Sequence, residues 1–115
     1  MESSERLLEF DVNKQRITKK KDCDFTNIVA GSVGYLKAKF YFSQDEWRDC
    51  RKAASFWVGE EEHARLLDET NSCIIPPEAL TGDRFQVSVT GVRPNYKIIT
   101  NKTKVKQEVY KDGNC

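Results

Sequence analysis

Alternating hydrophobic and polar positions mark residues 35–42 as a β-strand with one buried face. From Leu36 onward every second residue is apolar, and the residues between are lysine or tyrosine. A two-residue period is that of a strand that turns one face to a core and the other to water. The pattern breaks at Ser43, whose spacing from Glu46 is that of a capping box. We therefore expect one helical turn that brings Trp47 back onto the sheet.

Similar patterns predict short strands along the whole chain, eight or so in number, separated by turn residues. The expected segments are residues 8–12, 16–20, 35–42, 53–58, 63–67, 73–75, 85–90, 96–100 and 105–110. The first two would form one hairpin, and 63–67 with 73–75 a second. Many short strands at regular spacing indicate an antiparallel sandwich or small barrel. We expect an all-β antiparallel β-sandwich with one or two single-turn helices, occupying residues 1–115 as one domain.

The polar segment from Asp22 to Gly34 is predicted to be a crossing loop, with Phe25, Ile28 and Val29 sealing the edge of the core. A second helical turn is expected at Glu78–Leu80, after two prolines that end a strand. A chain of 115 residues can bury roughly 65% of its unfolded surface and so form one core. The residues expected in that core are Leu36, Phe40, Phe42, Trp47, Phe56, Phe85, Val87 and Val89.

The charge of the chain indicates no particular class of partner. The chain has 19 Lys and Arg against 18 Asp and Glu, a net charge of +1, and the two signs are interspersed. Such a balance creates no field that would select nucleic acid or a membrane surface, so neither is expected as a partner. The one basic run, Arg16 to Lys21, fits a solvated strand end.

The four cysteines are Cys23, Cys50, Cys73 and Cys115, and none belongs to a Cys-x-x-Cys pair. With a single histidine in the chain, a zinc site is not expected. The N-terminal residues lack the apolar stretch of a signal peptide, and no segment approaches a membrane span. We therefore expect reduced thiols in a cytoplasm.

Catalytic candidates are weak. His63 lies beside Glu61 and Glu62 on an expected strand, where a solvated imidazole is the simplest interpretation. No cysteine or serine is paired with it by sequence, and neighbouring carboxylates such as Asp22 and Asp24 show no spacing typical of a site. We assign no catalytic, cofactor-binding or metal-binding residue and expect no enzymatic activity.

Three aromatic residues are expected on outward faces. Tyr35 and Tyr41 alternate with Phe40, and Trp57 points away from its neighbour Phe56. Exposed aromatics can stack on sugars or form a protein interface. The simpler alternative is a two-sheet core with a few partly covered rings. Tyr35, Tyr41 and Trp57 are therefore the candidate interface residues.

The order of the segments resembles a known family. LLEFDVNKQRITKK, GSVGYLKAKFYFSQDEW, RKAASFWVG, LLDETNSCIIPPEAL and FQVSVTGV followed by ITNKTKVKQEVYKDG are similar to the small N-terminal domain of tailed-phage structural proteins from Gram-positive hosts, the baseplate and tail-fibre type. The resemblance runs from Leu8 to about Gly113. It implies a β-sandwich adaptor without a cofactor, made in the bacterial host cytoplasm and located in the virion. Its implied partners are copies of itself, as a homo-oligomer, and other virion structural proteins.

Two other functions remain open from the sequence. The outward aromatics are compatible with a carbohydrate-binding module for host attachment. The small size is also compatible with a phage-encoded inhibitor or binder of a host factor.

Overall fold

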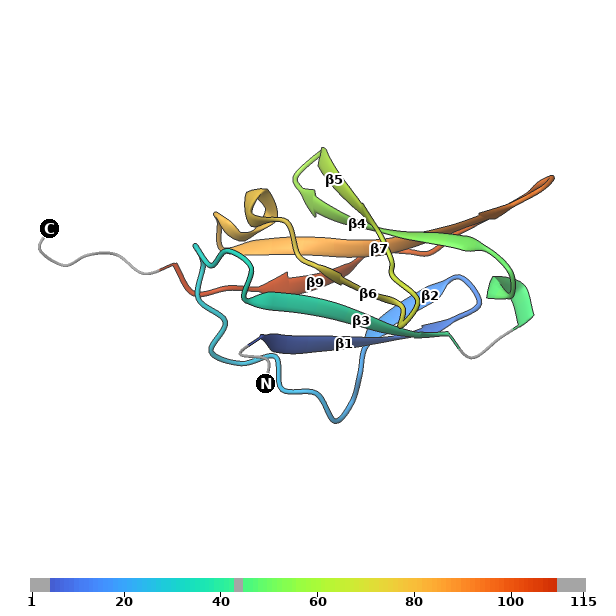
Figure 1. Cartoon of the computed structure of the whole chain (residues 1–115). Coiled ribbons are helices and arrows are strands. Elements are labelled where there is room, and N and C mark those ends of the chain that lie inside the picture. Colours follow the sequence, from blue (N-terminus) through green and yellow to red (C-terminus); the bar gives the residue numbers. More distant parts are fainter. Residues whose placement is uncertain (1–4, 43–44, 110–115) are drawn as a thin grey trace, which may run out of the picture.

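The chain is a sandwich of two β-sheets. A computed structural model describes residues 5–42 and 45–109 of the 115 residues. Within them it contains nine strands and two short 3-10 helices (Figure 1). The expected all-β sandwich with two single-turn helices is confirmed.

The first sheet has four strands in the order β2-β1-β3-β6. They are β1 (Arg6–Asn13), β2 (Arg16–Lys19), β3 (Leu36–Phe42) and β6 (Ser72–Ile74). In the second sheet β7 pairs with β4, and β4 pairs with β5, while β8 and β9 both pair with the other edge of β7. These strands are β4 (Arg51–Val58), β5 (Glu61–Leu66), β7 (Arg84–Arg93), β8 (Tyr96–Ile99) and β9 (Thr103–Lys106). The helices are η1 (Asp45–Trp47) and η2 (Pro77–Leu80).

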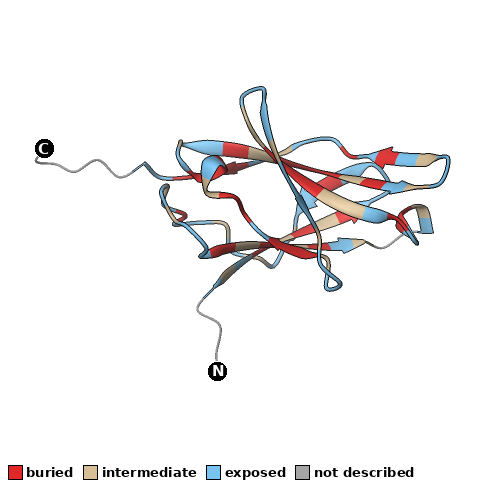
Figure 2. Cartoon of the chain, turned by 45° about the horizontal axis from the view of Figure 1, so that its top comes forward, coloured by how far each residue is buried: buried red, intermediate tan, exposed pale blue. Residues whose placement is uncertain are grey.

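The core lies between the sheets, and buried residues alternate with exposed or half-buried ones along most strands (Figure 2). Phe10 and Phe40 stack in the first sheet with ring centroids 5.3 Å apart, and Phe56 and Phe85 lie 6.2 Å apart in the second. Of the eight predicted core residues, seven are fully buried. The exception is Phe42, which is half-buried.

One pair of strands is parallel within the predicted antiparallel sandwich. β3 runs beside β1 in the same direction, with Arg6 opposite Leu36 and Val12 opposite Phe42. Parallel neighbours need a long crossover connection. The predicted loop from Asp22 to Gly34 supplies it, because it returns the chain to the end of the sheet where β1 begins. Ile28 and Phe25 pack on the core as expected.

Two local expectations are wrong. Val29 does not seal the core: its side chain is 43% exposed, and its backbone forms a β-bridge to Glu108. The predicted second hairpin is also absent, since β5 pairs with β4 and β6 pairs with β3. β4 and β5 are joined by only two residues, Gly59 and Glu60, and Gly59 has the positive φ of +61° that tight hairpin turns require.

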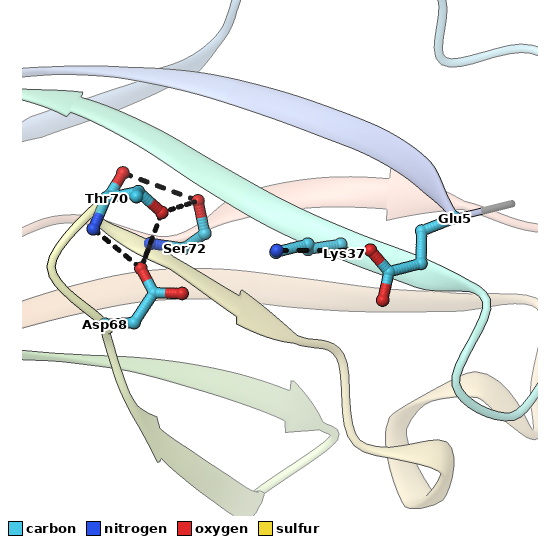
Figure 3. A network of polar contacts seen from close by, with 5 residues as sticks. All are labelled: Glu5, Lys37, Asp68, Thr70 and Ser72. Carbon is cyan, nitrogen blue, oxygen red and sulfur yellow. Dashed lines mark hydrogen bonds and ion pairs between the residues drawn. The ribbon is translucent and has the colours of Figure 1, made fainter. Parts of the chain in front are cut away.

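A hydrogen-bonded turn carries the chain from the second sheet to the first, between β5 and β6 (Figure 3). Asp68 Oδ1 accepts hydrogen bonds from the Thr70 hydroxyl at 2.6 Å, the Thr70 amide at 2.8 Å and the Ser72 amide at 3.1 Å. These bonds, that from the Thr70 hydroxyl first, hold the pKa of the Asp68 carboxyl below its ordinary value. The turn thereby fixes where β6 joins the first sheet.

The predicted corner after β3 is η1, and it places Trp47 inside the sandwich. The indole is 1% exposed, its ring lies 5.0 Å from that of Phe42, and its Nε1–H donates to the Lys14 carbonyl at 2.8 Å. Ser43, the expected capping residue, lies outside the described residues. The indole ring packs against Gly91 of β7.

Phe40 tests the register of β3. Because its ring is 1% exposed and stacks on Phe10, Phe40→Ala removes a large part of the core, and we expect a loss of about 3 to 5 kcal/mol in the free energy of unfolding. Lys39→Ala, on the opposite face, is the control and should cost less than about 0.5 kcal/mol. Urea denaturation of both variants makes the comparison. A larger loss for Lys39→Ala would mean that the register is off by one residue.

Gly91 tests the Trp47 site. A Cβ there would lie 2.8 Å from Cε3 and Cζ3 of Trp47 and 3.1 Å from Cys50 Cβ. Overpacking of a buried ring is expected to make Gly91→Ala cost about 1 to 3 kcal/mol. The control is Gly82→Ala, because no heavy atom of the described structure lies within 4 Å of a Cβ at that position. Equal melting temperatures for the two variants would contradict close packing of the indole on β7.

Candidate functional site on the five-stranded sheet

The three aromatic residues predicted from the sequence do not form one surface. Tyr35 precedes β3 and Tyr41 lies within it, so both belong to the first sheet, where they are 46% and 36% exposed. Trp57 lies on β4 of the second sheet and is half-buried. Because each points away from the core, Tyr41 and Trp57 lie on opposite sides of the sandwich.

Tyr41 is embedded in a charged surface. Its hydroxyl donates to the Glu9 carboxylate, and this bond raises the pKa of the Tyr41 phenol above its ordinary value. The ammonium groups of Lys20 and Lys39 lie 5.0 and 5.5 Å from its ring centroid. On β1 the outward residues Glu9 and Asp11 are charged as well, so this side of the sandwich is typical of a solvated face.

The opposite side differs. Its outward residues come from all five strands of the second sheet, and we call this surface the outer face: Glu62, Ala64 and Leu66 of β5; Arg51, Ala53, Ser55 and Trp57 of β4; Arg84, Gln86, Ser88, Thr90 and Val92 of β7; Lys97 and Ile99 of β8; and Lys104 and Lys106 of β9. Their outward direction follows from the burial of the residues between them, such as Phe56, Val87 and Val105.

An apolar row crosses the outer face from edge to edge. Leu66 is paired with Ala53, Ala53 with Thr90, and Thr90 with Ile99. Leu66 is 65% exposed and Ile99 is 45% exposed. Large apolar side chains therefore stand at the two edges, with a methyl group and a threonine between them.

The next row along the strands is made of small residues. Ala64, Ser55 and Ser88 are paired across β5, β4 and β7. Both serines are only 4% exposed, because their larger neighbours lean over them. The Ser55 hydroxyl donates to the Glu62 carboxylate, and Trp57 Nε1–H donates to the Ser88 hydroxyl oxygen at 3.0 Å. The centre of the outer face thus carries short side chains, and the hydroxyl groups of Ser55 and Ser88 already have hydrogen-bond partners.

A third row carries charge at its two ends. Glu62 on β5 is paired with Trp57 on β4, Trp57 with Gln86 on β7, and Gln86 with Lys104 on β9. The row therefore begins with an anion at one edge of the sheet and ends with a cation at the other.

Trp57 also borders a cavity of about 290 Å³, lined by Trp57, Gly59, Arg84, Phe85, Gln86 and Lys104. The Lys102 ammonium lies 3.8 Å from the centroid of the indole ring and holds it in place by a cation–π contact. An aromatic edge, two cations and one amide converge on this space. Such a set can contact a small polar ligand that carries negative charge.

A second cavity, of about 360 Å³, lies where β4 and the turn after β5 meet, and Cys50, Lys52 and Asp68 are among its lining residues. Its groups are used internally: Lys52 Nζ donates to the Cys50 carbonyl at 3.4 Å, and Asp68 accepts the hydrogen bonds of its own turn. We therefore give it less weight than the outer face.

The weak catalytic candidates are not assembled into a site. His63 Nε2 lies 3.3 Å from Glu61 Oε1 at an exposed strand edge. Cys23, Cys50 and Cys73 are free thiols, and Cys115 lies outside the described residues. Burial raises the pKa of the Cys73 thiol to about 12, so it is protonated at neutral pH. In the described ranges no group of three or more His, Cys, Asp or Glu side chains could hold a metal ion.

Comparison of the chain with protein-family models, with curated proteins and with solved structures found no match. Among the residues that the structure describes, no helix has the length and apolar character needed to cross a bilayer. The outer face therefore has to be interpreted from its own chemistry.

The sequence identifies Trp57 as an outward residue but does not reveal the surface around it. The alternation of Ala53, Ser55 and Trp57 is visible in the sequence, but small residues are equally compatible with a crowded core. Leu66 and Leu67 are neighbouring leucines, so the sequence alone does not show which of the two is outward. Only the pairing of β5 with β4 resolves this, because it places Leu66 beside Ala53.

Proposed function

We propose that the chain is a non-enzymatic assembly module that docks onto another protein through its outer face. The observation that supports this most directly is the apolar row from Leu66 to Ile99, which crosses four strands and leaves large apolar side chains in water. Large apolar side chains left in water on one sheet face are a feature of interaction sites.

The first sheet provides an internal comparison. Its two central strands direct Glu9, Asp11, Lys37 and Lys39 outward, the usual arrangement for a sheet face in water. The central strands of the second sheet direct alanine, serine, threonine, glutamine and tryptophan outward over Ala53–Trp57 and Gln86–Thr90, and their outward charges, Arg51 and Arg84, lie beyond these segments. Depletion of charge from the centre of a surface, with charge kept at its rim, is the compositional signature of a protein interface.

The resemblance to tailed-phage structural proteins suggests where such a module would act. We propose a role in a virion, as a baseplate, tail or head-fibre adaptor whose partners are copies of itself and neighbouring structural proteins. Docking of one sheet face on another protein suits this role, because it needs no catalytic group and no cofactor.

Substitutions of Leu66 and Ile74 test which sheet face docks on the partner. Leu66→Asp places a charge where a docked partner would exclude water, and we expect assembly to weaken by about tenfold or more. The matched control is Ile74→Asp, because Ile74 is a 37% exposed residue on the edge strand β6 of the other sheet. The readouts are sedimentation velocity over a concentration series and co-purification with the products of neighbouring genes. If Ile74→Asp or Tyr41→Glu abolished assembly while Leu66→Asp did not, the first sheet would be the docking surface.

The cavity beside Trp57 favours a second candidate function, recognition of an acidic sugar in host attachment. Arg84 and Lys104 supply positive charge, Gln86 an amide for hydroxyl groups, and the indole edge an apolar contact. The first probe is glucuronic acid, and glucose is the uncharged control. Binding of each sugar is measured by tryptophan fluorescence. Because Trp47 is 1% exposed, a saturable change should arise from Trp57 and disappear in Trp57→Phe. Equal responses to both sugars, or none, would exclude this function.

A further inference from the structure

We infer that the partner of the outer face is a protein whose contact surface carries carboxylates around an apolar centre. The inference rests on the proposed function, since it names the chemistry of the partner for the same surface. The cations of the outer face, and the apolar row between them, define what such a partner has to present.

Four cations gather at one end of the outer face, along β9 and at the start of β7. Lys104 and Lys106 are alternate residues of β9, so both point outward. Lys102 reaches the same face, where its ammonium lies over the Trp57 ring. Arg84 of β7 is paired with Lys106. All four side chains are exposed, and we call them the basic cluster: Arg84, Lys102, Lys104 and Lys106.

Little of the charge of the basic cluster is neutralised within the chain. Arg84 Nε lies 3.6 Å from Asp83 Oδ1, in an ion pair whose two side chains are largely exposed. Lys104 and Lys106 make no ion pair in the part of the chain that the structure describes. Glu62, the outward anion of the sheet, lies on β5 at the opposite edge. The cluster therefore keeps positive charge for a partner.

Two members of the basic cluster repel each other in the free chain. Arg84 and Lys106 stand directly opposite each other on antiparallel neighbours. Like charges at such positions lower the stability of a sheet. A carboxylate bound between them would replace this repulsion by two attractive contacts. The pair is thus better suited to a complex with an anionic partner than to water.

Two further cations stand at the other end of the outer face. Arg51 of β4 and Lys97 of β8 are both exposed, and both are paired with Val92 of β7. The apolar row from Leu66 to Ile99 lies between them and the basic cluster. The outer face thus carries cations at both ends and aliphatic side chains between them. Two copies of this face would repel each other, whereas an acidic surface is complementary to it.

The aliphatic residues favour a protein over a nucleic acid. Proteins hold single strands with aromatic side chains on which the bases stack. Trp57 is the one aromatic among the described outward residues of this sheet; it is half-buried, and Lys102 already covers its ring. A phosphate backbone offers nothing apolar to Leu66 and Ile99, which are 65% and 45% exposed. A protein surface can supply both carboxylates and aliphatic contacts.

Polyglutamate is the first probe, because it presents carboxylates on a polypeptide. Its binding is measured by fluorescence anisotropy at low and at physiological salt. The double variant Lys104→Glu with Lys106→Glu puts like charges where carboxylates would dock, and should raise the dissociation constant by about tenfold or more. The matched control is Lys19→Glu with Lys21→Glu, an equal change in net charge at exposed positions of the basic run, and should change the constant by less than about threefold.

Leu66 tests the apolar centre. A copolymer of glutamate and leucine should bind more tightly than polyglutamate, because its leucine side chains can cover the apolar row. Leu66→Ser should remove this difference and leave the dissociation constant for polyglutamate within about threefold of its original value. Equal affinities of the two polymers for the unmodified chain would overturn the apolar part of the inference.

Three results would overturn the acidic part. They are no binding of polyglutamate at low salt, equal loss of binding in the two double variants, and tighter binding of oligothymidylate than of polyglutamate. The second would mean that binding follows net charge alone, and the third that the face is a nucleic-acid site. Melting temperatures show that each variant is folded; Lys106→Glu should not lower them, because it turns a like-charge pair with Arg84 into an opposite one.

Co-purification with the products of neighbouring genes distinguishes the inference from the proposed function. If both Leu66→Asp and the double variant Lys104→Glu with Lys106→Glu remove it, the docked partner is acidic as inferred. If only Leu66→Asp removes it, the outer face docks on a partner that is not acidic, so the inference fails and the proposed function stands. If neither variant removes it, the proposed docking fails and the inference with it.

Discussion

The packing of Trp47 on Gly91 is the contact on which the arrangement of the two sheets depends. The indole comes from the corner after β3 in the first sheet, contacts Phe42 of that sheet, donates to Lys14 in the β1–β2 turn, and rests on β7 of the second sheet. One buried side chain therefore links both layers at the end of the sandwich where the chain crosses between them. Only glycine leaves room for it, because a Cβ would approach two ring carbons to 2.8 Å.

This corner also sets the register of the outer face. β4 begins at Arg51, four residues after Trp47, so the position of the indole fixes which residues of β4 turn inward. Ala54 and Phe56 enter the core, and Ala53, Ser55 and Trp57 must then face outward. A shift of one residue at the corner would place the small outward residues in the core and expose Phe56.

The strands were largely predictable from the sequence because their alternation is local. The period through Phe40 and the one through Val87 each need only a few residues to be recognised, and both strands lie where they were expected. Pairing was less predictable because it depends on contacts distant in sequence. The parallel neighbour of β3 is 30 residues earlier at Arg6, and no local signal encodes it. The outer face was missed for the same reason, because its rows are assembled from five strands.

An apolar row exposed to water can cause non-specific association, and the charges beside it reduce that tendency. A sheet face with Leu66 and Ile99 exposed could pack on any apolar surface, and its strand edges could extend into an open array. The charged residues at the edges of the same face, Glu62 on β5 and Lys97, Lys104 and Lys106 on β8 and β9, disfavour every alignment that brings like charges together. In the proposed docking, apolar burial supplies affinity, while the charges supply alignment.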